Sequence, residues 1–534
     1  MPETAAVAFG GQPARVRLRA DHATVVAVCG LTALGAIVRF YGLGHQGLWF
    51  DESYTAELVR YAPGKMLGLI PQTESTPPLY YMAAWAWVRI FGYGATALRS
   101  LSAVAGVLVI PVAYGAASEL VSRRAGLICA AFAACNPFLI WYSQEARSYE
   151  SLVLLSGLAL LGFARARRDP TPAAVALWVV AAALSMATHY FATLAIAPQA
   201  VLLLASHPRR RAVQVGVGVA ALCGLGLLPL AISQNGTGND SWIASAALGI
   251  RLAQIIPQFL IGTNAPVRQA LKLAAFALAL VALGLLTVRV ARAYSGRRTQ
   301  DDARARLARA ELGGALTAAV LAIGGFGLAL LLIVVGFDDL ITRNLIELWL
   351  PAAIVVAAGC AAPSRVAARL GTLIAAALCA IGLTAAIAIA ATPSMQRPDW
   401  PGVARILGSE PPAGQSRAIL VQEYGTLLPL KLYLPGLATL RAPVRVTQLD
   451  VISMQSPGQP LCWWGAECNL ISSARQRSYP IPGMHTAWVR HVRQFAITRL
   501  VAPRPVTLTR AVVARALTAT SLRHDELTVQ PPRG

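Results

Sequence analysis

Two adjacent acidic residues in an aromatic setting are the first candidates for chemistry. Asp51 and Glu52 stand between Trp49-Phe50 and Tyr54, shortly after a long apolar run. Aromatic rings favour the boundary between hydrocarbon and water, so we expect these acids near the headgroup level of a membrane. Acids there are costly and usually serve a function. We interpret both as catalytic; the alternative is that they cap an interfacial helix over 53–61 at its positive end.

A second polar segment, residues 141–150, lies between two later apolar runs and carries Glu145 and Arg147. These two side chains could orient an acceptor, pair with each other or bind a hydroxyl of a ligand. The alternative is a solvated loop whose acid caps the next helix. Arg343 precedes another apolar run and suits the phosphate of a lipid, because its planar fork binds oxyanions bidentately. Snorkelling to lipid headgroups is the alternative for Arg343.

Four further residues are weaker candidates for contacts with a substrate. Glu74 reads as a second acid, a metal ligand or a plain loop acid, and Tyr80 belongs to the aromatic run after Pro77-Pro78. Arg99 could meet a phosphate or snorkel. His189 stands at a tight turn, where a lone histidine is more often structural, and the spacing gives no full set of metal ligands. No cofactor is indicated, and a divalent metal ion at the acids stays open.

The composition places these residues in a membrane protein. The chain of 534 residues is 56% hydrophobic and 13% charged, with a mean hydropathy of +0.56, which is typical of integral membrane proteins. The net charge of +22 would suggest nucleic acid in a soluble protein. Here the arginines recur in short clusters between apolar runs, which is the pattern of cytoplasmic loops, so no nucleic-acid partner is expected.

About eleven apolar runs are expected to cross the membrane, each near the roughly 20 residues that hydrocarbon requires. The first is long enough to remain as a helix, and no cleavage site of small residues follows it, so no signal peptide is expected. The runs are 23–42, 98–118, 125–141, 149–164, 172–188, 190–206, 212–232, 269–288, 312–336, 344–362 and 370–391.

A further run, residues 77–91, is apolar but rich in aromatic residues, and the arginines decide its place. If 77–91 lies in the interface, every later arginine cluster up to residue 369 shares the side of the N-terminus. If it crossed, these clusters would face outward, which the positive-inside rule disfavours. We therefore expect a multi-pass protein of the cell membrane with the loop 43–97, the segment 142–148 and the region after 391 outside the cytoplasm.

The composition changes after residue 391, where turn residues and ordinary polarity begin. We expect a membrane domain over 1–391 and an extracytoplasmic α/β domain over 392–534. Strands are expected at 418–422 and 494–501, and helices at 403–407 and 512–519. Cys462 and Cys468 bracket a short polar segment and could close a disulfide loop, which needs an oxidising compartment.

The order and spacing of these segments resemble the GT-C class of membrane glycosyltransferases. The resemblance is nearest to the bacterial family 39 branch, related to protein O-mannosyltransferases and lipid A aminoarabinose transferases, and covers nearly the whole membrane part. The matching segments are Trp49-Phe50-Asp51-Glu52, Pro77-Pro78-Leu79-Tyr80-Tyr81, Leu98-Arg99-Ser100-Leu101 with Arg123-Arg124-Ala125, Tyr142-Ser143-Gln144-Glu145-Ala146-Arg147-Ser148-Tyr149, His189-Tyr190-Phe191, and Arg343-Asn344-Leu345 with Pro351.

The resemblance implies an inverting transferase that moves mannose or another single sugar from a polyprenyl-phosphate donor to an extracytoplasmic glycan, lipid or protein. It implies Asp51 as the base, with Glu52 nearby, and Arg343 on the donor phosphate. The chain departs from the family at Thr76, where histidine is frequent, and at Asn344, where tyrosine is usual. It also has Tyr149 where some members carry an acid that Glu145 would replace. The metal requirement and the sugar therefore stay open.

Two functions from other classes stay open as well. A transporter or flippase of a lipid-linked sugar would need a polar route through the centre of the bilayer. The mid-helix positions of this chain are almost wholly apolar, which disfavours that function. A non-catalytic binder of a lipid-linked sugar, with an outer domain that binds a partner, is the other alternative.

Overall fold

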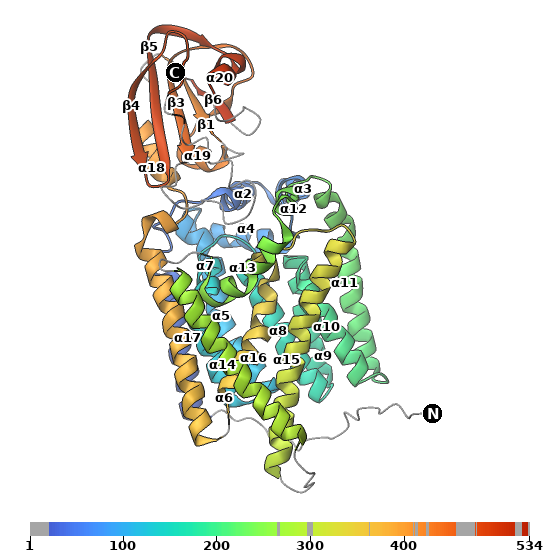
Figure 1. Cartoon of the computed structure of the whole chain (residues 1–534). Coiled ribbons are helices and arrows are strands. Elements are labelled where there is room, and N and C mark those ends of the chain that lie inside the picture. The colour runs from blue at the N-terminus through green and yellow to red at the C-terminus, as the bar shows by residue number, and fades with distance from the viewer. Residues whose placement is uncertain are drawn as a thin grey trace.

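The computed structural model has a long helical bundle with a smaller sheet-containing part at one end (Figure 1). Cys462 and Cys468 lie outside the residues that the structure describes, so the predicted disulfide is not addressed by it. The described residues are 21–263, 268–295, 303–362, 364–409, 411, 415–422, 427–454, 476, 478–517 and 526–531.

The helices of the bundle follow the predicted apolar runs closely. They are α1 (His22–Phe40), α2 (Phe50–Leu58), α3 (Pro63–Thr73), α4 (Leu79–Phe91), α5 (Ala95–Leu120), α6 (Arg123–Cys135), α7 (Pro137–Ser143), α8 (Tyr149–Arg168), α9 (Pro172–Thr188), α10 (Ala192–Ser206), α11 (Arg211–Asn235), α12 (Ser241–Ser245), α13 (Leu248–Ile261), α14 (Arg268–Ser295), α15 (Ala303–Val334), the 3-10 helix η1 (Thr342–Leu348), α16 (Trp349–Cys360) and α17 (Arg365–Ala391).

Each of the eleven predicted membrane runs coincides with helix. Among the described residues, eight helical stretches are long and apolar enough to span a membrane, or nine when α6 and α7 count as one span bent by 57°. Helices α9 and α10 are apolar but shorter. The chain is thus a mainly helical, multi-pass membrane protein. The amphipathic helix α13 was not predicted, because residues 233–268 were expected to be only a polar connection.

The bend between α6 and α7 has a local cause. Pro137 cannot donate a backbone hydrogen bond and disfavours helix in the residue before it. Asn136 therefore leaves the helical conformation and caps α7, accepting hydrogen bonds from the backbone N–H groups of Phe138 and Leu139 at 3.1 Å each.

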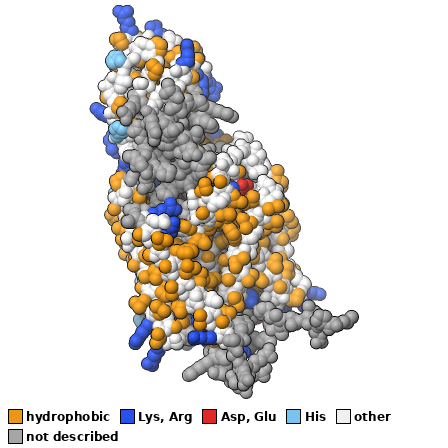
Figure 2. All heavy atoms as spheres, in the orientation of Figure 1, with side chains coloured by type: hydrophobic (Ala, Val, Ile, Leu, Met, Phe, Trp, Pro, Cys, Tyr) orange, Lys and Arg blue, Asp and Glu red, His pale blue; other side chains and the backbone are white. Residues whose placement is uncertain are grey.

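Helices α2, α3 and α4 gather at the end of the bundle that faces the sheet-containing part, and α4 lies across that end (Figure 1). This arrangement agrees with the interfacial place predicted for residues 77–91. The arginine clusters occupy the opposite end, below an apolar belt (Figure 2). There Arg168 pairs with Glu119 at 2.5 Å, and Arg124 donates to the hydroxyl of Thr372 at 2.8 Å.

The C-terminal part is an α/β unit. Among its described residues, six strands lie in the order β2-β6-β1-β3-β5-β4, with β1 parallel to β3 and the other neighbours antiparallel. Its elements are η2 (Pro393–Met395), α18 (Trp400–Leu407), β1 (Arg417–Val421), α19 (Leu428–Tyr433), β2 (Ala438–Thr439), β3 (Val444–Met454), β4 (His485–Val492), β5 (Phe495–Leu508), α20 (Arg510–Ala516) and β6 (Glu526–Gln530).

Alternation of side chains along β1 explains how helices cover both faces of this sheet. Ile419 and Val421 belong to a buried cluster with α18 and α19, whereas Ala418 and Leu420 belong to another with α20. A strand turns successive side chains to opposite faces, so an unbroken apolar strand is buried on both sides. Both predicted strands and both predicted helices of this part are present.

Candidate active site

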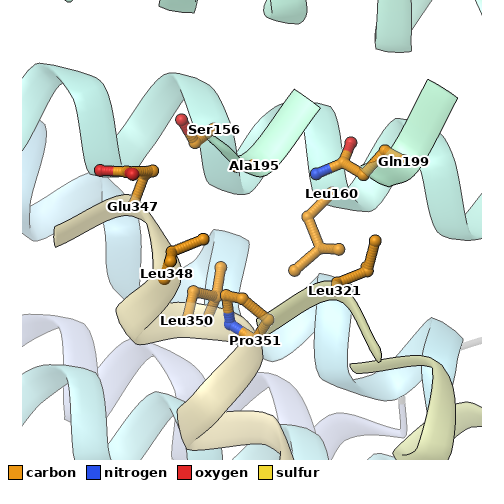
Figure 3. A pocket seen from close by; sticks show the side chains of 9 residues that line it. All are labelled: Ser156, Leu160, Ala195, Gln199, Leu321, Glu347, Leu348, Leu350 and Pro351. Atoms are coloured by element: carbon orange, nitrogen blue, oxygen red, sulfur yellow. The ribbon is translucent and has the colours of Figure 1, made fainter. Parts of the chain in front are cut away.

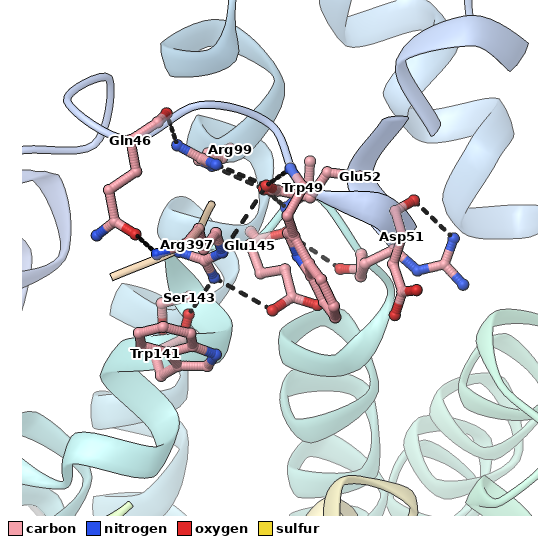
Figure 4. A network of polar contacts seen from close by, with 12 residues as sticks. Gln46, Trp49, Asp51, Glu52, Arg99, Trp141, Ser143, Glu145 and Arg397 are labelled. Carbon is pink, nitrogen blue, oxygen red and sulfur yellow. Dashed lines mark hydrogen bonds and ion pairs between the residues drawn. The ribbon is translucent and has the colours of Figure 1, made fainter. Parts of the chain in front are cut away.

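The predicted acids Asp51 and Glu52 lie in the first turn of α2, where negative charge meets the positive end of the helix. Glu52 is fully buried. Arg99 of α5 binds it with two hydrogen bonds, from Nε to Oε1 at 2.7 Å and from Nη2 to Oε2 at 2.5 Å. The backbone N–H of Ala146 adds a third at 2.9 Å. Glu52 therefore ties α2 to α5 and to the loop 144–148 (Figure 4).

Arg99 is fully engaged within the protein. Besides the two bonds to Glu52, its Nη atoms donate to the carbonyl oxygens of Leu43, Gln46 and Gly47 at 3.1, 2.8 and 2.8 Å. A guanidinium has five N–H groups, and these five acceptors use all of them. The prediction that Arg99 meets a phosphate of a ligand is therefore not supported, because no donor remains for it.

The charge state of Glu52 follows from its partners. Burial disfavours its ionised form, but the charges of Arg99 and Arg397 outweigh burial and hold the pKa of Glu52 below its usual value. An ionised, fully paired carboxylate is a poor acceptor for another proton. The geometry thus favours a positioning role for Glu52 over the predicted catalytic one.

Asp51 is the more accessible of the two acids. Its carboxylate is 17% exposed and accepts a hydrogen bond from Nη1 of Arg343 at 2.9 Å. Arg147 donates to its backbone oxygen at 3.4 Å. Residues separated by almost 300 positions in the chain are brought together here, and the predicted base faces the two arginines predicted to bind a ligand.

Arg343 lies at the start of η1, and two aromatic rings lie near its guanidinium. Its guanidinium lies 5.6 Å from the ring centre of Tyr149 and 5.7 Å from that of Trp242. Such faces attract a cation without consuming its hydrogen-bond donors. Trp242 belongs to α12, an element that the sequence did not predict.

Arg147 holds Glu74 in the same region. Its Nη1 lies 2.7 Å from Oε2 of Glu74, which also accepts a hydrogen bond from the hydroxyl of Tyr81 at 2.5 Å. Burial raises the pKa of Glu74, although Arg147 and Tyr81 oppose this effect. Nε of Arg147 is buried and has no hydrogen-bond partner among the described residues, so this predicted ligand-binding residue keeps a donor for another molecule.

Glu145 lies beside Glu52 and faces Arg397, a residue from the start of the C-terminal part. Nη2 of Arg397 is 3.1 Å from Oε2 of Glu145 (Figure 4). Oε1 of Glu145 is buried and has no hydrogen-bond partner in the described part of the chain. Burial raises the pKa of Glu145 to about 7, and Arg397 opposes the rise.

His189 and Tyr80 are buried at the edges of this region. Burial, with the nearby charges of Arg147 and Arg343, lowers the pKa of His189 to about 3, so the ring is neutral. Its Nδ1 faces the backbone N–H of Phe191 at 3.3 Å and therefore acts as an acceptor. The hydroxyl of Tyr80 lies 3.4 Å from that of Ser102, which places Tyr80 in the packing between α4 and α5.

Among the described residues, no three histidine, cysteine, aspartate or glutamate side chains come together as metal ligands would. The acids at this end of the bundle instead face arginines. The structure therefore offers no described ligand set for the divalent ion that the sequence left open.

A separate polar pocket lies deeper in the bundle and was not predicted. It is lined by Ser156, Gln199 and Glu347 together with apolar side chains from α8, α10, α15 and α16 (Figure 3). Glu347 is 2% exposed, and neither carboxyl oxygen has a hydrogen-bond partner among the described residues. An acid without such a partner is costly to bury in an apolar interior. The expectation of almost wholly apolar mid-helix positions has an exception here.

Comparisons with known proteins bear on these observations. The family model described as dolichyl-phosphate-mannose-protein mannosyltransferase matches residues 75–232, less than half of the chain. The resemblance stated from the sequence is confirmed. No curated protein matches the chain.

Several solved structures show likeness to the chain. ArnT from Cupriavidus metallidurans bound to undecaprenyl phosphate is 14% identical, with a TM-score of 0.48, and the match covers 90% of this chain and 98% of that one. The S. cerevisiae protein O-mannosyltransferase Pmt1-Pmt2 complex is 13% identical, with a TM-score of 0.33, over 44% of this chain and 37% of that one. An Archaeoglobus fulgidus oligosaccharyltransferase is 14% identical, with a TM-score of 0.41, over 67% and 52%. This chain thus spans only about half or less of the latter two.

Proposed function

We propose that the protein is a glycosyltransferase that moves a sugar, mannose or another single sugar, from a polyprenyl-phosphate donor to an acceptor with inversion at the anomeric carbon. The observation that carries this proposal is the pairing of Asp51 with Arg343, next to Arg147, at one end of a membrane bundle. A lipid-linked sugar phosphate needs cationic donors for its phosphate and a base for its acceptor. The match to the mannosyltransferase family model supports the same chemistry.

In the proposed reaction Asp51 takes the proton of an acceptor hydroxyl. The acceptor oxygen then forms a bond to the anomeric carbon on the face opposite the phosphate. The bond between that carbon and the phosphate oxygen breaks, and its electron pair leaves with the polyprenyl phosphate. Arg343 and Nε of Arg147, which has no hydrogen-bond partner among the described residues, stabilise the negative charge that develops on the departing phosphate.

We place this reaction on the non-cytoplasmic face of the cell membrane. The arginine clusters occupy the end of the bundle opposite α2, the helix that carries Asp51 (Figure 1, Figure 2), and such clusters mark the cytoplasmic side. The division into a membrane domain over 1–391 and an outer domain over 392–534 belongs to this proposal, as does a glycan, lipid or protein acceptor outside the cell.

The test uses the purified full chain with radiolabelled polyprenyl-phosphate mannose and a membrane extract as the source of acceptors. We expect the wild-type protein to consume the donor and Asp51→Asn to lose at least about 1,000-fold in rate, because an amide cannot take the proton. The thermal midpoint of Asp51→Asn in detergent should stay close to wild type. A transporter or a non-catalytic binder leaves the donor chemically intact, and a well-folded Asp51→Asn protein with full activity contradicts the role of Asp51.

A further inference from the structure

The side chain of Arg397 is buried in the helical bundle, although the residue belongs to a connecting segment. It follows α17 and η2, in the connection from the bundle to the C-terminal sheet, yet its side chain is only 3% exposed. The side chain turns back into the bundle, between Gln46, Trp141 and Glu145 (Figure 4). An arginine carries a large cost of burial unless it is paired, so its contacts need an explanation.

The contacts of Arg397 reach both buried acids next to Asp51. Nη2 bonds Oε2 of Glu145 at 3.1 Å and lies 3.4 Å from the backbone oxygen of Trp141. Nε lies 3.8 Å from Oε2 of Glu52, and the guanidinium stacks at 4.3 Å over the ring of Trp141. This one side chain therefore contacts the loop 144–148 and approaches α2, the two elements that frame the candidate active site.

The C-terminal part also contacts residues 43–49, the loop that leads into α2. The backbone N–H of Arg397 donates to Oε1 of Gln46 at 2.9 Å, and the backbone N–H of Leu48 donates to the hydroxyl of Tyr433 at 2.8 Å. A Cβ added to Gly47 would lie 2.5 Å from Cδ of Pro401, so α18 is in close contact with this loop. Loop 43–49 is therefore bonded both to Arg99 of α5 and to the C-terminal part.

The charges explain why an arginine is needed at this point. Glu52 and Glu145 are buried acids, and Arg99 is consumed by Glu52 and the carbonyl oxygens of loop 43–49. Without Arg397, Glu145 loses the partner that Figure 4 shows for it. A buried acid without a cation takes up a proton, and the loop that carries it then loses its charge-assisted bond.

We propose that Arg397 is a positioning residue through which the C-terminal part holds the loop 144–148 by its bond to Glu145 and keeps α2, with Asp51, in the arrangement that transfer requires. This inference rests on the proposed function. Under this inference the C-terminal part contributes a side chain to the active site, because its contact with the bundle places the guanidinium of Arg397 there.

The test compares Arg397→Ala and Arg397→Lys in the full chain with Arg493→Ala as a matched control. Arg493 contacts Gln396 and Asp399, which flank Arg397 in the chain, but it is exposed. Loss of one charge-assisted hydrogen bond corresponds to roughly 10- to 100-fold. We expect kcat for radiolabelled polyprenyl-phosphate mannose to fall by that factor in Arg397→Ala, with less than about threefold change in KM, and to be unaffected in Arg493→Ala.

A pH profile separates positioning from a general loss of structure. We expect the acidic limb of kcat to move to higher pH in Arg397→Ala, because Glu145 then protonates more easily, and to stay near wild type in Arg397→Lys, which keeps the charge. An equal rate loss at every pH contradicts the inference. The titratable and charged groups that interact electrostatically with the Glu145 carboxyl are Arg397, Glu52, Asp51, Arg343, Arg99, Tyr80, Tyr142 and Tyr149.

A second measurement keeps this inference separate from the proposed function. Hydrogen–deuterium exchange of the unliganded protein should rise in residues 43–52 and 144–148 of Arg397→Ala and not in Arg493→Ala. If the wild-type protein consumes no donor while exchange changes as expected, the proposed function fails and the positioning contact stands. If exchange is unchanged in Arg397→Ala, or its activity equals wild type, the inference is overturned.

Discussion

At the scale of residues, neighbouring acids have different environments and therefore different roles. Asp51 is partly exposed and faces Arg343, whereas Glu52 is fully buried and paired with Arg99. The sequence predicted a catalytic role for both, because it contains nothing that distinguishes two adjacent acids in one helix. Their partners come from α5 and η1, so only the fold distinguishes them. Arg397 was missed because its surroundings in the chain are those of an ordinary connection.

Arg343 should matter more for the donor than for the acceptor. We expect Arg343→Ala to raise KM for polyprenyl-phosphate mannose by about 10- to 100-fold, because a charge-assisted bond to the phosphate is lost, and to change the acceptor KM by less than about threefold. Arg343→Lys should be intermediate, since it keeps the charge but not the planar fork. Arg60→Ala, at an exposed position, serves as the control. Equal weakening of donor and acceptor would count against contact with the phosphate.

Glu145 should make stability depend on pH. Its pKa is raised from 4.5 to about 7 in the folded protein, so the folded state binds the proton more tightly than the unfolded state. This contribution to stability is full below about pH 4.5 and is lost as the pH rises through about 7, with a total of about 3 kcal/mol. Glu145→Gln should therefore flatten the fall in thermal midpoint between pH 5 and 8. Parallel curves for the two proteins would show that Glu145 does not titrate there.

At the scale of elements, small residues allow the helices around the site to approach closely. Gly106 of α5 is an example: a Cβ added there would lie 2.2 Å from Oγ of Ser143, 2.8 Å from Nε of Arg39 and 2.9 Å from Oε1 of Glu150. Arg39 in turn bonds Ser143 at 3.0 Å and the carbonyl oxygen of Ala133 at 2.8 Å. This buried polar cluster supports the loop that carries Glu145.

Gly106→Ala should accordingly destabilise the bundle. The added methyl group has no room between α1, α7 and α8, and overpacking costs about 1–3 kcal/mol. Gly218→Ala in α11 is a matched control, because a Cβ there meets no atom within 4 Å and alanine favours helix. Thermal midpoints in detergent check both variants, and a midpoint for Gly106→Ala at or above wild type would mean that α5 can shift without cost.

The sequence predicted long elements well and short ones poorly for physical reasons. A run of about 20 apolar residues can bury itself only by crossing a bilayer or filling a core, so all eleven runs were recognisable. Helices α12 and α13 are short, and their burial depends on neighbours from distant parts of the chain. The sequence also could not predict the hydrogen bonds of Arg99, because three of its acceptors are backbone carbonyl oxygens. Any sequence would supply such oxygens.

At the scale of the whole molecule, the apolar belt, the arginine clusters and the C-terminal part define a direction along the bundle (Figure 1, Figure 2). The sheet-containing part lies at the end that carries Asp51, and it contacts the loop before α2. The C-terminal part and the candidate site must therefore share one side of the membrane.

Cysteine labelling in intact cells checks this direction. In a background with Cys462 and Cys468 replaced by serine, Thr486→Cys on β4 should react with a membrane-impermeant maleimide before lysis. Arg210→Cys, between α10 and α11 at the opposite end, should react only after lysis. Both positions are exposed in the structure. Labelling of both from the same side would show that the arginine clusters do not mark the cytoplasmic face.

The ion pair between Asp51 and Arg343 has a consequence for kinetics. In the empty protein the proposed base, Asp51, is paired with Arg343, the cation proposed to bind the donor phosphate. Under this proposal the carboxylate becomes available only once the lipid has arrived. Substrates should then add in a compulsory order, lipid before acceptor. Undecaprenyl phosphate, as a product analogue, should compete with the donor and not with the acceptor. Before the lipid arrives, the Asp51 carboxylate is thus withheld from acceptor and water alike.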